Sequence, residues 1–487
     1  MSLEKHIRRG ACLVAAIATL AASLAHAALP RLVGRAFLDA GIPLNAVGLV
    51  VQEVGEAHPL FALDAERPMS AASVMKTVTT FAALDLLGPD FRWKTEAFVQ
   101  GSLDNGTLTG DLVLKGHGDP KITVEQWQAF MLGLRSAGLN AITGDLVLDR
   151  SYFRLPPHDA ARFDGDPQKP YNVGPDAMLL NFKAVRFVFA PDVAGRIDVR
   201  VEPPMPQITV GAPPRGAEGE CNDWRGPLHA AFADRHTTVL ATFAGTYPVS
   251  CGERDWYLSL LDPTAYALGM FSVYFREAGG TFDGRAREGR APSDAAPFAT
   301  LLSPPLYDIV RDVNKLSNNV MARQVFLTLA TTAYPPPVTT TQAAETVKQW
   351  LARRRIRMPG LVLDNGSGLS RLERVSAAGL ARMLAAADAS PVRDEFVSSL
   401  AVAAVDGTVQ RRFQNGTVAG QALLKTGTLD GVRALAGYVI DATGRRWIVV
   451  AFINHANAGR GQGALDFLVQ WVYRNAAEWK KMGPGAN

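Results

Sequence analysis

The stretch SAASVMKTVTTFAALDLLG, residues 70–88, combines an apolar helical pattern with a serine and a lysine near its start. It has few turn-forming residues, its apolar positions spread almost around the helix, and Gly88 followed by Pro89 ends it. We therefore predict a mostly buried helix. Ser73 and Lys76 are three residues apart and lie on one face of it, which raises the question of what a lysine does there.

The Ser-x-x-Lys spacing is weak evidence by itself. Ser2 and Lys5 show the same spacing by chance. A lysine near a helix start is usually solvated, and serine is a common helix cap. Signals elsewhere in the chain must decide between capping and catalysis.

The first 27 residues have the pattern of an export signal. Lys5, Arg8 and Arg9 form a basic start, residues 10–24 are apolar, and the triplet AHA at 25–27 fits a cleavage site. The apolar run is too short and too rich in alanine for a membrane span. We expect cleavage after Ala27.

Length and charge exclude some function classes. The 487 residues carry a net charge of +4, and the basic start of the signal leaves about +2 on the mature chain. This balance supports neither nucleic-acid binding nor electrostatic attachment to a membrane. The length suggests two or three domains.

Cysteine use fits an exported chain. Cys12 lies in the signal, so Cys221 and Cys251 are the pair that remains. An even pair in an oxidising compartment predicts a disulfide. The alternatives are two free thiols or a metal pair, but no suitable His or Cys lies nearby, and we expect no metal and no cofactor.

The outer parts of the chain predict an antiparallel sheet flanked by helices. The expected strands are 46–54, 59–66, 423–427, 432–441 and 445–455. The expected helices are 31–40, the helix after Ser70, 262–278, 303–333, 374–388 and 462–481.

The middle of the chain has a different character. TGDLVL occurs at 109–114 and again at 143–148, with a helical pattern at 124–139 between the copies. Two related strands flanking one helix explain this echo better than a repeat array. Residues 150–260 are rich in Pro, Gly and Asp. We predict an inserted, mostly β region at 91–261, of two lobes, within a catalytic domain made of 28–90 and 262–487.

Three further signals lie in the C-terminal part. Ser317-Asn318-Asn319 begins a predicted helix, Lys425-Thr426-Gly427 lies on a predicted strand, and DNGSGLSR (364–371) is a turn-rich loop between them. Ser-x-x-Lys, Ser-x-Asn and Lys-Thr-Gly in this order are the set found in serine β-lactamases and penicillin-binding proteins. Singly, they could be a helix cap and an edge-strand lysine. Jointly, after an export signal, they favour catalysis.

The chemistry requires these residue types. A serine hydroxyl needs an adjacent base, and Lys76, buried and near Lys425, could have a lowered pKa and serve as that base. Ser317 can relay a proton to the leaving amine, while Asn319 can donate to a substrate carbonyl. Lys425 and Thr426 would hold a terminal carboxylate. The strand at Thr428 would pair with the peptide, and the backbone N–H groups of Ser73 and Thr428 would form the oxyanion hole.

On these motifs the chain resembles the D-alanyl-D-alanine carboxypeptidase/endopeptidase family, the class C low-molecular-mass penicillin-binding proteins. The resemblance covers residues 30–480 and includes GHGDPKIT (116–123), YNVGPDAMLLN (171–181) and VDGTVQRRF (405–413). The long interval between Ser73 and Ser317 also fits, because this family inserts extra domains there.

The resemblance implies a penicillin-binding/β-lactamase-like transpeptidase fold, α/β in the broad sense (α+β). It also implies a periplasmic serine peptidase that acts on peptidoglycan stem peptides and is acylated by β-lactams. Ser73 would be the nucleophile, Lys76 the base, and Ser317, Asn319 and Lys425 the remaining motif residues.

The segment around Asp166 resembles the part of the family's inserted domain that contacts the diaminopimelate side chain, which makes Asp166 a candidate substrate contact. Arg371, outside the inserted region, is a similar and weaker candidate. Two positions depart from the family pattern. The second motif has Asn318 where Asp is usual, and Asn365 precedes Gly366 where the family more often has Asp. The second departure could shift the loop locally.

Two rival functions remain. A serine β-lactamase would need a dedicated deacylating base, and none is obvious near the motifs. A non-catalytic cell-wall binding protein could have kept the fold, although intact Ser73, Lys76, Ser317 and Lys425 argue against it. The sequence does not separate carboxypeptidase from endopeptidase activity, and it does not indicate the oligomeric state.

Overall fold

The sequence motifs lie on and around a six-stranded antiparallel sheet. The computed structural model describes residues 29–235, 237–414 and 416–482. The strands follow the order β17-β18-β19-β20-β1-β2, and each neighbouring pair is antiparallel. Their bounds are β1 Val47–Glu53, β2 Phe61–Leu63, β17 Ala401–Val402, β18 Ala422–Leu429, β19 Val432–Ile440 and β20 Arg446–Asn454. The predicted fold class is confirmed, and all five predicted strands are present.

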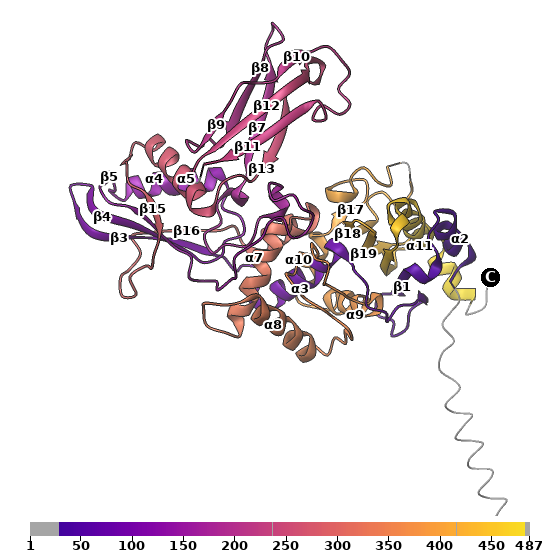
Figure 1. Cartoon of the computed structure of the whole chain (residues 1–487). Coiled ribbons are helices and arrows are strands. Elements are labelled where there is room, and N and C mark those ends of the chain that lie inside the picture. Colours follow the sequence, from indigo (N-terminus) through magenta and orange to yellow (C-terminus); the bar gives the residue numbers. More distant parts are fainter. Residues whose placement is uncertain (1–28, 236, 415, 483–487) are drawn as a thin grey trace, which may run out of the picture.

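Helices cover both faces of this sheet (Figure 1). One face carries α3 (Lys76–Leu87), α6 (Leu306–Lys315), α7 (Asn319–Leu329), α9 (Ala377–Asp388) and α10 (Arg393–Ser398), with α8 (Thr340–Arg353) packed outside them. The other face carries α2 (Arg31–Asp39) and α11 (Gln462–Met482). Alternate residues of β19 divide between the two cores. Ala436 and Tyr438 lie in the core that contains α3 and α9, and the Tyr438 hydroxyl donates to the carbonyl of Leu384 in α9. Leu435 and Val439 lie in the core with α11. Helix α3 is therefore buried, as its composition predicts.

The predicted helix at 303–333 is wrong in one respect, because the structure breaks it in two. Helix α6 ends at Lys315, Ser317 adopts a positive φ of 59°, and Asn318 caps α7 by accepting a hydrogen bond from the N–H of Met321. A positive φ is costly for serine, so packing on both sides must hold the turn. The break places Ser317 outside either helix.

A second sheet forms the base of the inserted region (left in Figure 1) and is mixed. Its strands are β3 Lys94–Asp104, β4 Thr107–Gly116, β5 Ala141–Ile142, β6 Leu146–Asp149, β14 Thr281–Phe282, β15 Ala286–Glu288 and β16 Ala299–Leu302. Helices α4 (Val124–Ser136) and α5 (Pro263–Glu277) pack on it, with Trp127 Nε1 donating to the carbonyl of Met270.

The TGDLVL echo corresponds to two adjacent parallel strands. Leu112 lies opposite Leu146, and Leu114 lies opposite Leu148, so equivalent residues of the two copies are in register. Helix α4 makes the crossover between them, as parallel pairing requires. The predicted arrangement of two strands around one helix is confirmed.

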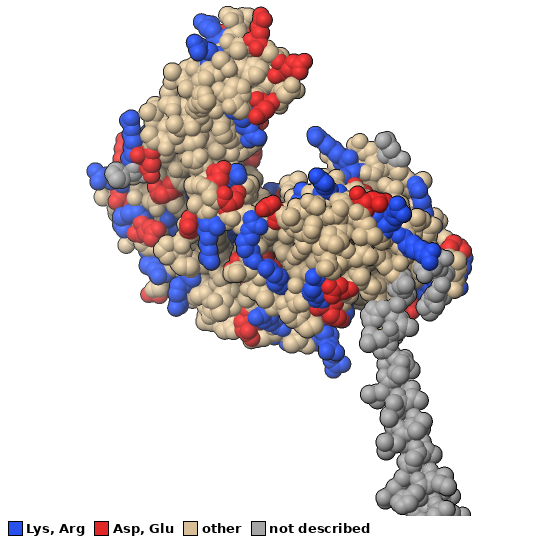
Figure 2. Space-filling model, turned by 45° about the vertical axis from the view of Figure 1, so that its right-hand side comes forward, with Lys and Arg blue, Asp and Glu red and all other residues tan. Residues whose placement is uncertain are grey.

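A third group of strands forms a lobe that projects from this base (top of Figure 1). The strands are β7 Val185–Pro191, β8 Ile197–Glu202, β9 Ile208–Val210, β10 Arg215–Ala217, β11 Leu228–Asp234, β12 Val239–Pro248 and β13 Arg254–Leu258. Figure 2 shows the surface hollowed between this lobe and the body that carries the motifs, with acidic and basic side chains interspersed.

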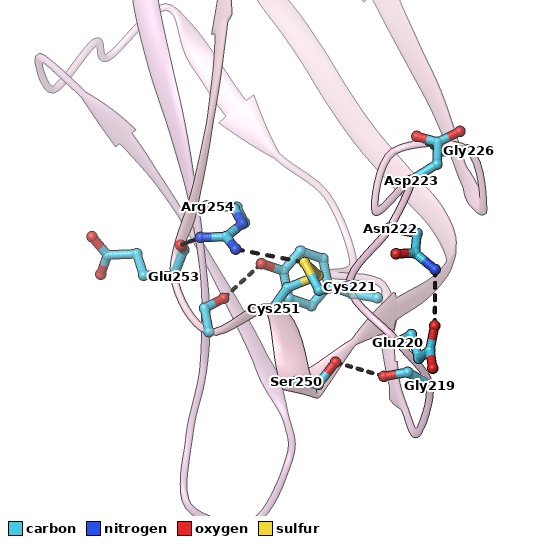
Figure 3. Close-up of a disulfide and its surroundings, with 12 residues drawn as sticks. Gly219, Glu220, Cys221, Asn222, Asp223, Gly226, Ser250, Cys251, Glu253 and Arg254 are labelled. Atoms are coloured by element: carbon cyan, nitrogen blue, oxygen red, sulfur yellow. Dashed lines mark hydrogen bonds between the residues drawn. A yellow bond between two sulfur atoms is a disulfide. The ribbon is translucent and has the colours of Figure 1, made fainter. Parts of the chain in front are cut away.

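The projecting lobe contains the predicted disulfide (Figure 3). Cys221 and Cys251 are bonded, with their Cα atoms 4.9 Å apart. Cys251 is buried beside Tyr247, whose hydroxyl donates to the carbonyl of Gly252 at 2.6 Å. The bond ties the loop before β11 to the end of β12, where the lobe has little regular structure.

The limits of the inserted region stay a prediction at 91 and 261. Because α5 and strands β14–β16 belong to the inserted sheet, we propose that the region continues to about Leu302, the end of β16, which pairs with β3. The expected signal at 1–27 lies outside the described residues. No described helix is both long and apolar enough to cross a membrane.

Candidate active site

Ser73 and Lys76 meet at the start of α3. Ser73 lies in a 3-10 turn, Ala72–Met75, that leads directly into the helix. Lys76 Nζ lies 3.0 Å from Ser73 Oγ. The same nitrogen donates to Asn319 Oδ1 and to the carbonyl oxygen of Ser367, both at 2.5 Å. The lysine is therefore held on three sides, with the serine within reach of a proton transfer.

The second and third motifs join this pair. Lys425 Nζ, from the middle of β18, donates to Ser317 Oγ at 2.8 Å. Lys76 Nζ donates to the oxygen of the Asn319 amide, so the NH₂ group of that amide is directed elsewhere. The structure thus brings together Ser73, Lys76, Ser317, Asn319 and Lys425 from three separate segments of the chain.

Both lysines are fully buried. Burial lowers the pKa of Lys76 well below its usual value, and the nearby positive charges of Lys425 and Arg323 lower it further, while Glu373 opposes them. Burial lowers the pKa of Lys425 to about 7. A neutral amine next to a serine hydroxyl is a competent general base.

Strand β18 lies along the Ser73 turn. A Cβ added to Gly427 would come within 2.4 Å of the carbonyl oxygen of Ala71, so the close approach requires glycine. Strand β17 pairs only with Leu423 and Leu424, which leaves the outer edge of β18 at Thr428 without a strand partner among the described residues. Thr426 Oγ1 is hydrogen-bonded to Thr408 Oγ1 at 2.8 Å. An unpaired edge beside a nucleophile can accept an extended peptide.

The DNGSGLSR loop forms another side of the site. A Cβ on Gly368 would lie 1.9 Å from the carbonyl oxygen of Ala72, so the loop touches the Ser73 turn directly. Asn365 keeps the loop folded, since its Oδ1 accepts from the N–H and the hydroxyl of Ser367. With Asn in place of the usual Asp, the loop still contacts the Ser73 turn.

Arg371 and Asp166 occupy different surroundings. Arg371 stacks on the Phe163 ring at 4.8 Å and lines a cavity of about 540 Å³ together with Arg323 and Asn172. Asp166 is half-exposed, pairs with Lys169 at 3.4 Å, and is not among the cavity's lining residues. The structure therefore places Arg371 in a cavity beside the DNGSGLSR loop and does not bring Asp166 to that cavity.

Sequence reasoning missed two buried charged residues at this site. Glu373 is 2 % exposed and accepts hydrogen bonds from the loop that contacts Lys76, and Arg323 donates to the carbonyl of Val173 at 2.8 Å. The sequence did offer one signal for Glu373, because an acidic residue follows shortly after the glycine-rich turn at 364–368. Nothing in the local pattern of α7 distinguishes Arg323 from a surface residue.

Comparison with known proteins agrees with this geometry. The model of the D-Ala-D-Ala carboxypeptidase 3 (S13) family matches residues 33–474, which include every motif described above. This chain belongs to that family. The predicted enzyme class, a serine-type D-Ala-D-Ala peptidase, is confirmed by this membership.

Several relatives match over most of their length. The chain is 26 % identical to the D-alanyl-D-alanine carboxypeptidase DacB of Haemophilus influenzae, over 85 % of this chain and 86 % of the relative. It is also 26 % identical to a D-alanyl-D-alanine carboxypeptidase of an Actinomadura species, over 85 % of this chain and 78 % of the relative.

Solved structures show the same fold. Penicillin-binding protein 4 of Haemophilus influenzae superimposes with a TM-score of 0.77 at 23 % identity, covering 92 % of this chain and all of that one. A predatory endopeptidase of Bdellovibrio bacteriovorus gives a TM-score of 0.52 at 16 % identity, covering 88 % of this chain and 92 % of the other.

Proposed function

We propose that Ser73 is the acylated nucleophile of a periplasmic D-Ala-D-Ala peptidase that acts on peptidoglycan stem peptides. The observation that carries the proposal is the 3.0 Å contact between Ser73 Oγ and Lys76 Nζ, a buried amine whose pKa burial holds well below its usual value. The predicted export signal and the names of the relatives support the location and the substrate.

Acylation would begin with neutral Lys76. As Ser73 Oγ attacks the carbonyl carbon of the penultimate D-alanine, its proton passes to Lys76 Nζ. The backbone N–H groups of Ser73 and Thr428 would stabilise the resulting oxyanion, and losing one such donor typically costs about 3–4 kcal/mol of transition-state stabilisation. Asn319 Nδ2 would donate to a substrate amide carbonyl, since Lys76 already occupies the amide oxygen.

Bond cleavage requires a proton for the leaving amine. Ser317 Oγ accepts from Lys425 Nζ at 2.8 Å, so its own hydroxyl proton is free to be given to that amine. The proton that Lys76 took from Ser73 would then replace it on Ser317, which returns Lys76 to the neutral form. Lys425 and Thr426 would bind the terminal carboxylate by charge-assisted hydrogen bonds. Water then hydrolyses the ester on Ser73.

Carboxypeptidase and endopeptidase reactions share these steps. Both break the bond on the carboxyl side of D-alanine and differ in the leaving amine, which is D-alanine in one and the side-chain amine of diaminopimelate in the other. Arg371, in the 540 Å³ cavity, would contact the longer substrate. Asp166 needs a local rearrangement to join it, because Lys169 now holds its carboxylate.

A serine β-lactamase is the rival with the same acylation apparatus. Rapid deacylation requires a base that activates water near the ester. Among the described residues no Asp or Glu is hydrogen-bonded to Ser73, and the carboxylate of Glu373 is occupied by backbone N–H groups. The solved β-lactam complex of the Haemophilus influenzae protein supports the hypothesis that this chain is a penicillin-binding peptidase.

The deciding experiment follows the intact mass of the mature protein with benzylpenicillin from minutes to hours, beside Ser73→Ala. A lasting single adduct, absent from the variant, is expected and would justify comparing D-alanine release with crosslink cleavage. An adduct that disappears while the drug is consumed would favour a β-lactamase. No adduct at any time would overturn the assignment of Ser73 and favour the binding-protein alternative.

A further inference from the structure

Glu373 is a buried carboxylate bonded to backbone N–H groups. Its Oε1 accepts from the N–H groups of Asp364 at 3.2 Å, Asn365 at 3.0 Å and Gly366 at 2.7 Å. Its Oε2 accepts from the N–H of Gly368 at 2.8 Å. No ion pair to this carboxylate is found within the described part of the chain. Burial raises the pKa of Glu373, and the N–H groups of Asn365, Gly366 and Asp364 oppose that rise because they favour the charged carboxylate.

One peptide group connects this carboxylate to the catalytic lysine. The carbonyl of Ser367 accepts from Lys76 Nζ at 2.5 Å, and the N–H of Gly368, which belongs to the same peptide unit, donates to Glu373 Oε2. A second anchor lies beside it, because Thr79 Oγ1 of α3 donates to the carbonyl of Gly366 at 2.6 Å. The N–H groups of the loop thus face Glu373 and its carbonyls face α3.

We propose that Glu373 is a positioning residue for the acylation of Ser73. Its carboxylate fixes and polarises the Ser367–Gly368 peptide, and the carbonyl of that peptide holds Lys76. This inference rests on the proposed role of Ser73 and Lys76. A carboxylate at the N–H end makes the carbonyl at the other end a stronger acceptor, because hydrogen bonds in a chain polarise one another at low dielectric. The lysine is then kept at one orientation toward Ser73 Oγ.

The negative charge also balances the positive groups around Lys76. Lys425 of β18 and Arg323 of α7 face the amine and favour its neutral form, whereas Glu373 favours its charged form. The negative charge of Asp364, from the same loop, raises the pKa of Glu373. Two separate effects of Glu373 therefore follow: one on the geometry of Lys76 and one on the pH at which Lys76 becomes a base.

The test is Glu373→Gln, measured by the second-order rate of benzylpenicillin acylation across pH. The amide keeps the shape, loses the charge, and turns an NH₂ group toward backbone donors. We expect the maximal rate to fall roughly 10²-fold, the loss typical of a misplaced catalytic group. We also expect the acid limb of the profile to move to lower pH by about one unit, because an opposing negative charge has gone.

Asp441 provides a matched control. It is another buried carboxylate, accepting from the N–H groups of Thr443 and Arg445 and from Trp447 Nε1 at the far end of β19. Asp441→Asn should lower the melting temperature and leave the rate and the pH midpoint unchanged. A shift of the midpoint in this variant as well would overturn the specific role of Glu373.

Glu373→Asp covers the case in which Glu373→Gln does not fold. Its side chain is one methylene shorter and keeps the charge, so we expect a slower rate with the wild-type pH midpoint. A folded variant of either kind with both the wild-type rate and the wild-type midpoint overturns the inference. The proposed function fails separately, because in that case the unmodified protein itself would not be acylated.

Discussion

The body that carries the motifs and the projecting lobe bury different kinds of group. Around Ser73 the buried side chains include Lys76, Lys425, Arg323 and Glu373, each with specific hydrogen-bond partners. The core of the projecting lobe is aromatic instead, and its rings of Phe187, Phe189, Phe243, Tyr247, Trp224 and Trp256 lie 5.0–6.4 Å apart in contacting pairs.

This difference separates what stabilises the molecule from what gives it a function. Burying a charge costs free energy that hydrogen bonds only partly offset, so a fold gains little stability from it. Aromatic packing and a disulfide are stabilising without any catalytic use. We therefore expect mutations in the two regions to have opposite profiles, with activity lost in one and stability lost in the other.

The largest effect is expected for Lys76→Met. Removing the base should slow benzylpenicillin acylation by about 10⁴-fold, at the upper end of general-base contributions. The melting temperature should change little, because the loss of three hydrogen bonds is offset by relief from burying an amine whose pKa burial lowers. Intact mass and thermal unfolding measure the two quantities.

Lys183→Met is the control from the inserted region. Lys183 is also a largely buried lysine with a pKa lowered by burial, and it donates to the carbonyl of Leu261 at 2.7 Å. Its replacement should leave acylation unchanged. Equal losses in the two variants would mean that burying lysine, and not the contact with Ser73, matters.

Phe243→Ala should give the reverse profile. Phe243 is fully buried, with the Phe189 ring at 5.0 Å and the Phe187 ring at 5.1 Å. Its truncation should cost about 3–5 kcal/mol of unfolding free energy. Denaturant unfolding measures this loss, and the acylation rate of the folded fraction should equal that of the wild type.

Phe232→Ala serves as the comparison, since Phe232 lies at the partly exposed edge of the same cluster and should cost less. A drop in the acylation rate of folded Phe243→Ala would show that the lobe acts on the catalytic centre. That result would remove the separation between the two regions.

The smallest expected effect is on the pH dependence of kcat/KM. Burial lowers the pKa of Lys425 to about 7, so in the free enzyme its charge is present below that pH and lost above it. For peptides ending in a carboxylate, kcat/KM should fall by about 10-fold on the alkaline side as this charge-assisted contact is lost. A peptide with a C-terminal amide should lack this limb, and equal profiles for both peptides would contradict the role of Lys425.

Local patterns predicted most of the fold. Helix α3, helix α5 with its Asp262 cap, and the strands β18–β20 follow from period and turn signals over a few residues. The break at Ser317 was missed, because a positive φ at serine is imposed by packing and leaves no local signature. The predicted end of the inserted region at 261 stays a prediction; the proposed end near Leu302 rests on the pairing of β16 with β3, which joins segments distant in the sequence.

The sequence by itself determined the type of chemistry, because Ser-x-x-Lys, Ser-x-Asn and Lys-Thr-Gly in order require only residue identity and local spacing. Only the tertiary structure decided how the chemistry is set up. It brought Lys425 to Ser317, directed the Ser367 carbonyl to Lys76, and buried Glu373 behind that peptide. These contacts depend on which distant segments of the chain pack together and exclude water. The loss of water lowers the pKa of a buried lysine, which is what allows it to act as a base near neutral pH.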